Sequence, residues 1–323
     1  MSAAALLADD GVLADEPCLE FGASVAVDRV GGHAVLVWRG AALAAAAAGI
    51  STSPLPPSGQ WSQVVVHVHK SRPGTWADLA RAWRCLAPEG RLLVLGGNDL
   101  GIATTLKRLG AELGQTPHIL ANRARARVGV FRHSPAAAPS EPMPTVLTVE
   151  GRSLETAPGV FSAERLDLGS VLLLEHMAVL DGAATLADLG AGCGVLGLSA
   201  AIRNQACQVR LFEADHRAVA CAQRNGEHWA PGRVSTQWWD AEADPAPEPV
   251  AAVVCNPPFH QGKAVDLSAA QAMFRAIDAS LQPKGLALVV ANRQLPYEAD
   301  LRAIGACEEL ATRDGFKLML IRR

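Results

Sequence analysis

The sequence lacks the features of a membrane-spanning or disulfide-bonded protein. Its longest apolar run, Ala41 to Ile50, is too short to cross a bilayer as a helix. No basic segment leads into an apolar run near the N-terminus, so we expect no signal peptide. The seven cysteines are odd in number and include no Cys-x-x-Cys pair, which argues against a disulfide framework and a zinc site. We expect buried, reduced thiols in a cytoplasmic protein that has no membrane partner and no metal.

The chain has little net charge, but its charges are unevenly distributed. The formal net charge is −3, which by itself gives no support to nucleic-acid binding. Residues 1–140 carry 13 Lys and Arg against 10 Asp and Glu, and within 61–133 the numbers are 11 and 4. A phosphate backbone could use such a basic region. An ordinary solvated surface would look the same, so charge alone leaves both interpretations open.

A proline-rich segment divides the chain. The length of 323 residues exceeds the usual size of one domain. Residues 134–144 contain four prolines and few residues that could pack in a core, as expected of a linker. We therefore predict one domain over 1–135 and a second over 145–323.

Both halves alternate short apolar runs with helical patterns. In the first half the expected strands are 34–38, 64–68, 91–95 and 128–131, and the expected helices are 75–86 and 102–113. In the second half the expected strands are 185–189, 209–212, 234–239, 250–255 and 286–291, with helices from 195 and over 217–228 and a hairpin within 308–321. Such alternation predicts an α/β fold with two tandem Rossmann-like, doubly wound domains, the second ending in an antiparallel hairpin.

A glycine-rich segment follows the first strand of the second half. Gly190, Gly192 and Gly194 would let the backbone turn sharply and approach a ligand closely. Glu213 ends the next strand, 23 residues after Gly190, where a carboxylate can accept both hydroxyls of a ribose. The order of Asp188, the three glycines and Glu213 favours S-adenosylmethionine as the cofactor. Asp188 precedes the glycines and would face the amino acid portion of that cofactor.

Two further aspartates follow the second and third strands of this half. Asp240 could accept a hydrogen bond from the adenine amino group. Asp215 is better explained as the N-cap of the helix after Glu213. A rival interpretation also exists, because Gly192, Gly194 and Gly197 form a Gly-x-Gly-x-x-Gly pattern that NAD-dependent dehydrogenases share.

The tetrapeptide Asn256-Pro257-Pro258-Phe259 closes a buried strand at the sheet edge where α/β folds bind ligands. An exocyclic amine on a nucleobase is a poor nucleophile because its lone pair is delocalised into the ring. The Asn256 oxygen and the Pro257 carbonyl can accept its two N–H groups and direct the lone pair at a methyl donor. The two prolines hold the backbone carbonyls in place, and Phe259 can stack on the base. These four residues are the predicted catalytic residues.

The second half resembles the bacterial ribosomal RNA guanine-N2 methyltransferases, and among them most of all the small-subunit (16S) methyltransferase C group. The resemblance rests on the following segments: 158–162, 166–167, 169–170, 188–194, 256–260, 290–292, 295–297 and 315–317. It implies that residues 188–194, Glu213 and Asp240 bind S-adenosylmethionine, and that Asn256 to Phe259 hold an unstacked guanine. It also implies a degenerate first domain that supports RNA binding or folding, and ribosomal RNA or an assembled subunit as partner.

Other functions remain compatible with these residues. The same chemistry could act on a large-subunit guanine, an adenine amine or a protein glutamine amide. The chain could also be a dehydrogenase, or a non-catalytic RNA-binding protein with a vestigial site. The intact glycine segment and Asn256 argue against the last of these.

Overall fold

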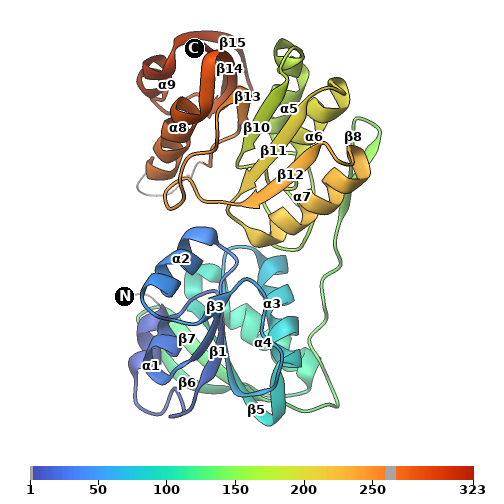
Figure 1. Cartoon of the computed structure of the whole chain (residues 1–323). Coiled ribbons are helices and arrows are strands. Elements are labelled where there is room, and N and C mark those ends of the chain that lie inside the picture. Colours follow the sequence, from blue (N-terminus) through green and yellow to red (C-terminus); the bar gives the residue numbers. More distant parts are fainter. Residues whose placement is uncertain (1–2, 259–266) are drawn as a thin grey trace. The chain divides into compact units, whose positions relative to one another are not determined.

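The computed structural model describes residues 3–258 and 267–323, which form two compact units, Met1–Met143 and Pro144–Arg323 (Figure 1). The first unit contains η1 (Ala3–Ala8), β1 (Cys18–Phe21), α1 (Val25–Val30), β2 (Gly32–Val35), α2 (Arg39–Ala47), β3 (Thr52–Ser53), β4 (Trp61–His67), α3 (Arg72–Arg84), β5 (Leu86–Gly97), η2 (Asn98–Leu100), α4 (Ile102–Leu113), β6 (His118–Arg123) and β7 (Ala126–Arg132). The second contains β8 (Val146–Val149), β9 (Arg152–Glu155), α5 (Leu168–His176), η3 (Met177–Leu180), β10 (Thr185–Leu189), α6 (Val195–Arg203), β11 (Gln208–Glu213), α7 (His216–Trp229), β12 (Val234–Trp238), β13 (Val250–Cys255), α8 (Ser268–Ser280), β14 (Leu281–Asn292), α9 (Glu298–Ile304), β15 (Ala306–Arg313) and β16 (Phe316–Arg322).

The two units have the same sheet topology. The strand order is β3-β2-β1-β4-β5-β7-β6 in the first and β12-β11-β10-β13-β14-β16-β15 in the second. Five neighbouring strands in each sheet are parallel, and the last two pair antiparallel. The prediction of two doubly wound α/β domains with a terminal hairpin in the second is therefore confirmed.

Several predicted elements match the observed ones closely, and others were missed. Strands β10 and β13 and helix α4 have the predicted bounds. The hairpin β15–β16 turns at Asp314 and Gly315, which both have a positive φ, as a two-residue turn requires. Strand β1 and the hairpin β8–β9 were not predicted, because four-residue strands are too short to give a periodic signal.

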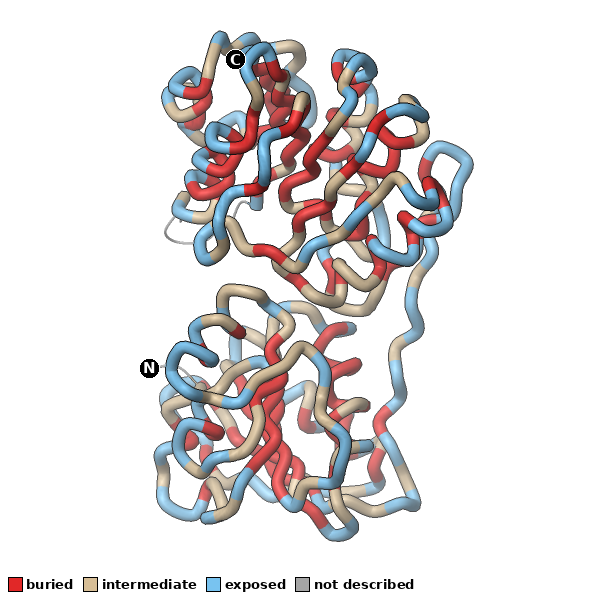
Figure 2. Tube along the Cα trace, viewed as in Figure 1, coloured by how far each residue is buried: buried red, intermediate tan, exposed pale blue. Residues whose placement is uncertain are grey.

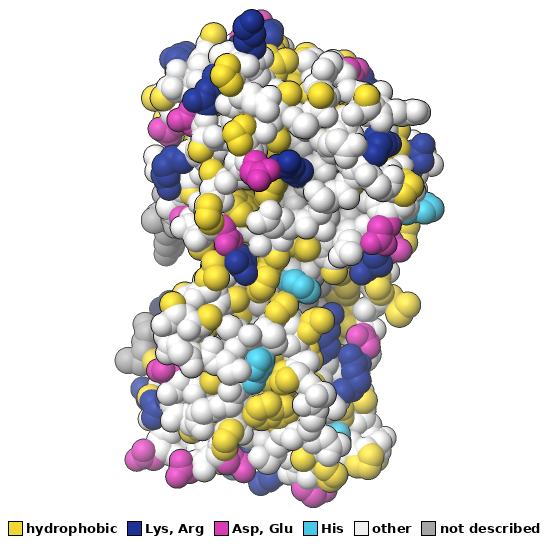
Figure 3. All heavy atoms as spheres, in the orientation of Figure 1, with side chains coloured by type: hydrophobic (Ala, Val, Ile, Leu, Met, Phe, Trp, Pro, Cys, Tyr) yellow, Lys and Arg dark blue, Asp and Glu magenta, His cyan; other side chains and the backbone are white. Residues whose placement is uncertain are grey.

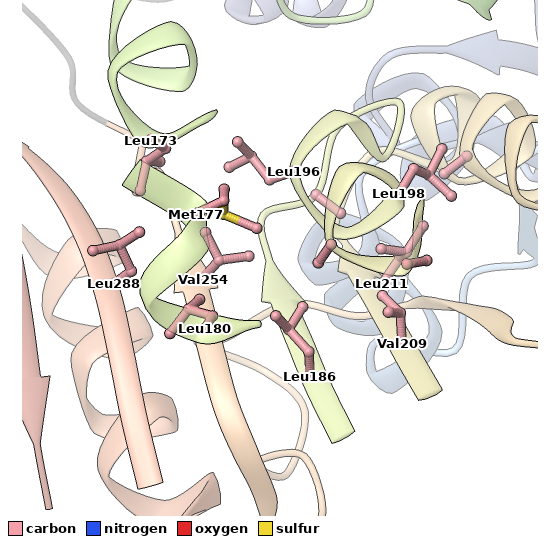
Figure 4. Close-up of a cluster of buried hydrophobic side chains, with 14 of the residues drawn as sticks. Leu173, Met177, Leu180, Leu186, Leu196, Leu198, Val209, Leu211, Val254 and Leu288 are labelled. Atoms are coloured by element: carbon pink, nitrogen blue, oxygen red, sulfur yellow. The ribbon is translucent and has the colours of Figure 1, made fainter. Parts of the chain in front are cut away.

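The central strands of the second sheet are largely buried, which explains the continuous apolar sequence of β13 (Figure 2). On one face Leu173, Met177, Leu196 and Leu198 from α5, η3 and α6 pack on Leu186, Val209, Leu211, Val254 and Leu288 (Figure 4). On the other face α8 contributes Phe274 and Ile277 against Leu189 and Val253. Each such aliphatic side chain stabilises the fold by about 1.5–3 kcal/mol. The packed sheet is a rigid base for the loops at its edge.

The predicted linker begins on the surface of the first unit. The indole Nε1 of Trp83 donates to the carbonyl of Ala137 at 3.0 Å, and that of Trp76 donates to Ser140 Oγ at 3.1 Å. Arg84 pairs with Glu141 at 2.7 Å. Residues after 135 are thus bound to helices of this unit.

Among the described residues, none of the helices combines the length and apolar character needed for a membrane span. Within the same ranges, no cluster of three or more His, Cys, Asp or Glu side chains is arranged to hold a metal ion.

Candidate active site

The predicted site residues of the second unit meet at the carboxyl edge of its parallel strands. In the sheet register, Leu189 at the end of β10 pairs with Phe212 on one side and Cys255 on the other. The residues that follow these strands therefore lie side by side. A Cβ placed on Gly190 would lie 3.2 Å from Cε of Met273 and 3.9 Å from the carbonyl oxygen of Asn256. The glycine-rich turn and the Asn-Pro-Pro segment are direct neighbours.

The glycine-rich turn has the backbone that its sequence predicts. Gly190, Gly192 and Gly194 have φ values of +75°, +56° and +93°, a region that residues with a Cβ rarely adopt. The N–H groups of Gly190 and Ala191 donate to the carbonyl of Phe212 at 2.9 and 3.0 Å. No atom of the described structure lies within 4 Å of a Cβ built on Gly192, so the turn exposes bare backbone there.

Glu213 is held against this turn. Its Oε2 accepts a hydrogen bond from the Gly192 N–H at 2.7 Å, and its Oε1 accepts one from the Asp215 N–H at 2.8 Å. Burial raises the pKa of the Glu213 carboxyl group, while the backbone hydrogen bonds act in the opposite direction. The carboxylate is thus placed at the end of β11, beside the open face of the turn.

Asp188 is fully buried at the end of β10. Its Oδ2 accepts a hydrogen bond from the Gly197 N–H in the first turn of α6 at 2.8 Å, which ties the strand to the helix. Its Oδ1 has no hydrogen-bond partner within the part of the chain that the structure describes. Burial raises the pKa of this carboxyl group to about 7. One oxygen is therefore structural, and the other is a buried acceptor without a protein donor.

Asp240 lies two residues after the end of β12, the strand that pairs with β11. The Trp239 N–H donates to the Glu213 carbonyl at 2.9 Å, which links the two strand ends. Asp240 Oδ1 accepts from the Glu242 N–H at 2.9 Å and so shapes the loop that follows. Asp215 caps α7 through the Arg217 N–H at 3.0 Å, as predicted.

The side-chain amide of Asn256 has one defined orientation. Its Nδ2 donates to Asp167 Oδ2 at 2.9 Å and to Ser170 Oγ at 3.0 Å. A carboxylate can only accept, so the nitrogen must face Asp167. The amide oxygen is then the atom left to interact with another molecule, and as an acceptor it suits a donor such as an amine.

The rest of the tetrapeptide is described in part. Pro257 is buried and Pro258 is exposed. Phe259, the predicted stacking residue, lies outside the described residues, as does the neighbouring His260.

Two separate segments of the resemblance meet near this edge. Lys317, only 4% exposed, donates from Nζ to the Leu295 carbonyl at 3.0 Å and also contacts Glu298. Tyr297 is buried, with its ring 5.0 Å from that of Phe274 in a T-shaped arrangement. Lys317 thus fixes the loop that follows β14.

Three supporting residues were not identified as such from the sequence. Asp167 and Ser170 were noted only as parts of the resemblance, although Asp-x-x-Ser ahead of an apolar run is a recognisable N-cap pattern. Asn225 of α7 donates to the carbonyls of Cys193 and Glu155 and accepts from the Glu155 N–H. No local pattern marks it, because its partners are 32 and 70 residues away.

The first unit fills the equivalent position with protein contacts. Glu20 near the end of β1 occupies the place that Asp188 has in β10. Its Oε2 accepts from the N–H groups of Ala26 and Val27 at 2.8 and 3.0 Å, and its Oε1 lies 2.6 Å from His67 Nε2. Both carboxylate oxygens therefore have partners inside the unit. Glu20 therefore offers no free oxygen to a ligand at this position, whereas Asp188 retains an unpartnered oxygen within the described part of the chain.

The residues of the second unit fit an adenosine cofactor that carries an amino acid group. The Gly192 backbone leaves space for close approach. Glu213 offers carboxylate oxygens at the strand end, and the unpartnered Oδ1 of Asp188 can accept from an ammonium group. This arrangement combines a nucleoside-binding edge with an amine-accepting amide on the next strand.

Comparisons with known proteins agree with this geometry. The model of the methyltransferase small domain family matches residues 151–320. The ribosomal RNA small subunit methyltransferase C of Stutzerimonas stutzeri is 31% identical over 274 residues, 81% of this chain and 80% of the relative. The ribosomal RNA large subunit methyltransferase G of Streptomyces griseus is 37% identical over 166 residues, 50% of this chain and 43% of the relative.

A solved structure is similar over nearly the whole chain. It is the T. thermophilus 16S rRNA N2 G1207 methyltransferase in complex with AdoMet and guanosine, with 26% identity and a TM-score of 0.85. The match covers 99% of this chain and 91% of that one. The prediction of a methyltransferase is therefore confirmed, and the dehydrogenase alternative is wrong. The chain belongs to the ribosomal RNA small subunit methyltransferase C family and is an S-adenosylmethionine-dependent methyltransferase.

Proposed function

We propose that this enzyme methylates the exocyclic N2 amine of one guanine in 16S ribosomal RNA, the guanine that corresponds to G1207 of the T. thermophilus relative. The observation that carries the proposal is the fixed amide of Asn256, which turns an acceptor oxygen towards an incoming amine. Similarity to the guanosine-bound relative along 99% of the chain supports the choice of guanine. With a ribosomal substrate, the enzyme acts in the cytoplasm.

The cofactor contacts are assigned to six residues. Asp188 accepts from the ammonium group through the oxygen that has no donor among the described residues. Gly190, Gly192 and Gly194 form the turn that holds the cofactor, with open backbone at Gly192. Glu213 accepts from the ribose hydroxyls, and Asp240 from the adenine amino group. When bound, S-adenosylmethionine supplies a methyl group on an electron-poor sulfonium. Support comes from the position of all six at one sheet edge.

The substrate contacts are assigned to the strand end of β13. Asn256 Oδ1 and the Pro257 carbonyl accept the two N–H groups of the guanine amine, which directs its lone pair out of the ring plane. Pro258 restricts the backbone after Pro257. Phe259 stacks on the base. These groups orient the amine, and transfer then depends on position more than on a strong base.

The first unit is proposed to support RNA binding. Its carboxyl edge carries Trp38, 53% exposed, and the exposed Lys70, Arg72 and Arg125. Arg125 belongs to this edge because its carbonyl accepts from Asn98, just after β5. On the face shown in Figure 3, basic and acidic side chains are interspersed, so any cationic surface is local. An exposed indole beside cations suits unpaired nucleotides, by base stacking and phosphate contact.

Methyl transfer to isolated ribosomal subunits tests the proposal. Labelled S-adenosylmethionine is incubated with 30S subunits, 50S subunits and naked 16S RNA from a strain that lacks the gene, and the product nucleoside is identified and mapped. Label in N2-methylguanosine at one 16S position is expected. Label only in the 50S subunit would favour the large-subunit alternative, to which the Streptomyces griseus relative points. Label in an adenine or in protein would refute the guanine assignment.

A further inference from the structure

Three side chains at the start of α5 and the end of β13 form one hydrogen-bonded group. Asp167 Oδ2 accepts from the Asn256 amide and from the Ser170 N–H, at 2.9 and 3.1 Å. Ser170 Oγ accepts from the same amide nitrogen at 3.0 Å. Both N–H bonds of the Asn256 amide are therefore directed at the first turn of α5, 86 and 89 residues earlier in the chain.

We propose that Asp167 and Ser170 are positioning residues, which fix the Asn256 amide so that its oxygen accepts from the substrate amine. This inference rests on the proposed function. An isolated asparagine amide can rotate and exchange its oxygen and nitrogen, and only the oxygen can accept. Asp167 Oδ2 and Ser170 Oγ both accept from the amide nitrogen, so the amide keeps one orientation. The pair thus selects a substrate that donates hydrogen bonds at the reacting atom.

Packing keeps the first turn of α5 close to the strand. Gly169 is buried, and a Cβ built on it would lie 2.9 Å from Asp167 Oδ2, 3.2 Å from Val290 Cγ1 and 3.3 Å from Phe316 Cε1. Glycine is required because an alanine would displace the capping carboxylate or the strand side chains. The carboxylate therefore has little freedom to leave Asn256. Gly169→Ala is expected to lower methyl transfer in the same way as loss of Asp167.

The negative charge of Asp167 adds to the effect of geometry. A hydrogen bond from an amide nitrogen to a carboxylate is stronger than one to a neutral group, and it polarises the amide so that its oxygen becomes a better acceptor. During transfer, positive charge develops on the guanine nitrogen. A more strongly accepting Asn256 oxygen favours that state over the ground state.

A reciprocal exchange of the two side chains tests the proposal. Asp167→Ala is expected to lower kcat roughly 10- to 100-fold, because the amide loses its strongest partner and can rotate. Asn256→Asp places two carboxylates face to face and should be at least as damaging. The double variant Asp167→Asn with Asn256→Asp restores a donor opposite an acceptor, but it weakens the cap, because the atom that faces position 256 can no longer accept from the Ser170 N–H. It should be at least about tenfold more active than Asn256→Asp alone.

Two controls and two independent readouts accompany these variants. Asp181→Asn removes a carboxylate that pairs with Arg203, before β10, and Glu248→Gln removes an exposed carboxylate that pairs with Arg210. Both controls should keep wild-type turnover. Binding of S-adenosylhomocysteine by calorimetry and the thermal unfolding temperature are measured for every variant. For the exchanged pair, cofactor binding should stay near wild type, and the unfolding temperature should fall only by the loss of the cap at Ser170.

Two outcomes would overturn the inference: wild-type kcat in Asp167→Ala, or a double variant no more active than Asn256→Asp. Failure of the proposed function would look different, because the wild-type enzyme itself would then not modify guanine N2. The same variant series is informative on whichever amine the wild type methylates.

Discussion

The carboxylate of Glu213 accepts a hydrogen bond from the backbone N–H of Gly192, at 2.7 Å. This bond joins the end of β11 to the turn after β10, and it places the carboxylate beside bare backbone. Residues 21 positions apart in sequence thereby form one surface for a nucleoside.

Glu213→Gln should weaken cofactor binding. Glutamine keeps one acceptor oxygen but presents an NH₂ group to a backbone N–H or to the ribose. We expect affinity for S-adenosylhomocysteine to fall roughly 10- to 100-fold, measured by calorimetry. Glu227→Gln, an exposed change on α7, is the matched control and should bind normally. Normal binding by the Glu213 variant would remove this residue from the proposed site.

Cofactor binding should depend on pH through Asp188. Burial raises the pKa of its carboxyl group to about 7, so the ligand-free protein is largely protonated there at pH 6. A bound ammonium group favours the ionised form, so binding should release a proton below pH 7 and tighten as pH rises towards 7. Calorimetry in buffers of different ionisation enthalpy measures that proton. Equal affinity at pH 5.5 and 8, without proton release, would contradict the assigned contact.

The same carboxyl group should lower the stability of the ligand-free protein as pH rises, although it raises the affinity for the cofactor. Because its pKa is raised in the folded state, ligand-free stability should fall as pH rises from about 4 to about 7, by on the order of 4 kcal/mol. Asp188→Asn keeps an acceptor for Gly197 but cannot ionise. The variant should unfold at a higher temperature than wild type at pH 8, and the difference should vanish near pH 4.

Asn256→Ala should separate binding from chemistry. The change removes the acceptor that orients the amine, while the glycine-rich turn and Glu213 keep their contacts. We expect turnover to be abolished with S-adenosylhomocysteine binding unchanged. Wild-type methylation by this variant would show that the amide does not orient the substrate.

Asn225→Leu should destabilise the second unit. The substitution is close in volume but leaves the Cys193 and Glu155 carbonyls and the Glu155 N–H without the bonds they now have. We expect a loss of about 2–4 kcal/mol in the free energy of unfolding, measured with urea. The exposed Gln223→Leu on the same helix is the control, expected to change stability by less than about 0.5 kcal/mol.

The basic edge of the first unit should contribute to RNA affinity. Replacement of Lys70, Arg72 and Arg125 by alanine should weaken binding to ribosomal RNA and flatten its salt dependence. The log–log slope should fall by roughly 0.7–0.9 for each phosphate that the variant no longer neutralises. Arg81→Ala with Arg84→Ala, at the opposite end of α3, is the control. An unchanged slope in the triple variant would assign RNA binding to other surfaces.

Much of the fold is a local property of the sequence. Strand β13 is a continuous apolar run, β10 is a short run that ends at the glycine-rich segment, and α4 has a regular apolar stripe between glycines at both ends. Their bounds could therefore be predicted. The three alternating glycines likewise permit the positive φ angles that the turn adopts. The short strands β1, β8 and β9 depend on partners for their conformation, and no local pattern marked them.

The sequence alone thus determined much of the alternation of strands and helices, the chemical nature of the cofactor edge and the family resemblance, because backbone preference and side-chain type are encoded residue by residue. Only the tertiary structure decided which way the Asn256 amide faces. It also decided that both oxygens of Glu20 have partners within their own unit, while Asp188 keeps an oxygen without a donor in the described ranges. These features depend on hydrogen bonds between residues 6 to 89 positions apart. Such bonds form when the sheet brings the strand ends together, and they have no periodic signature in the chain.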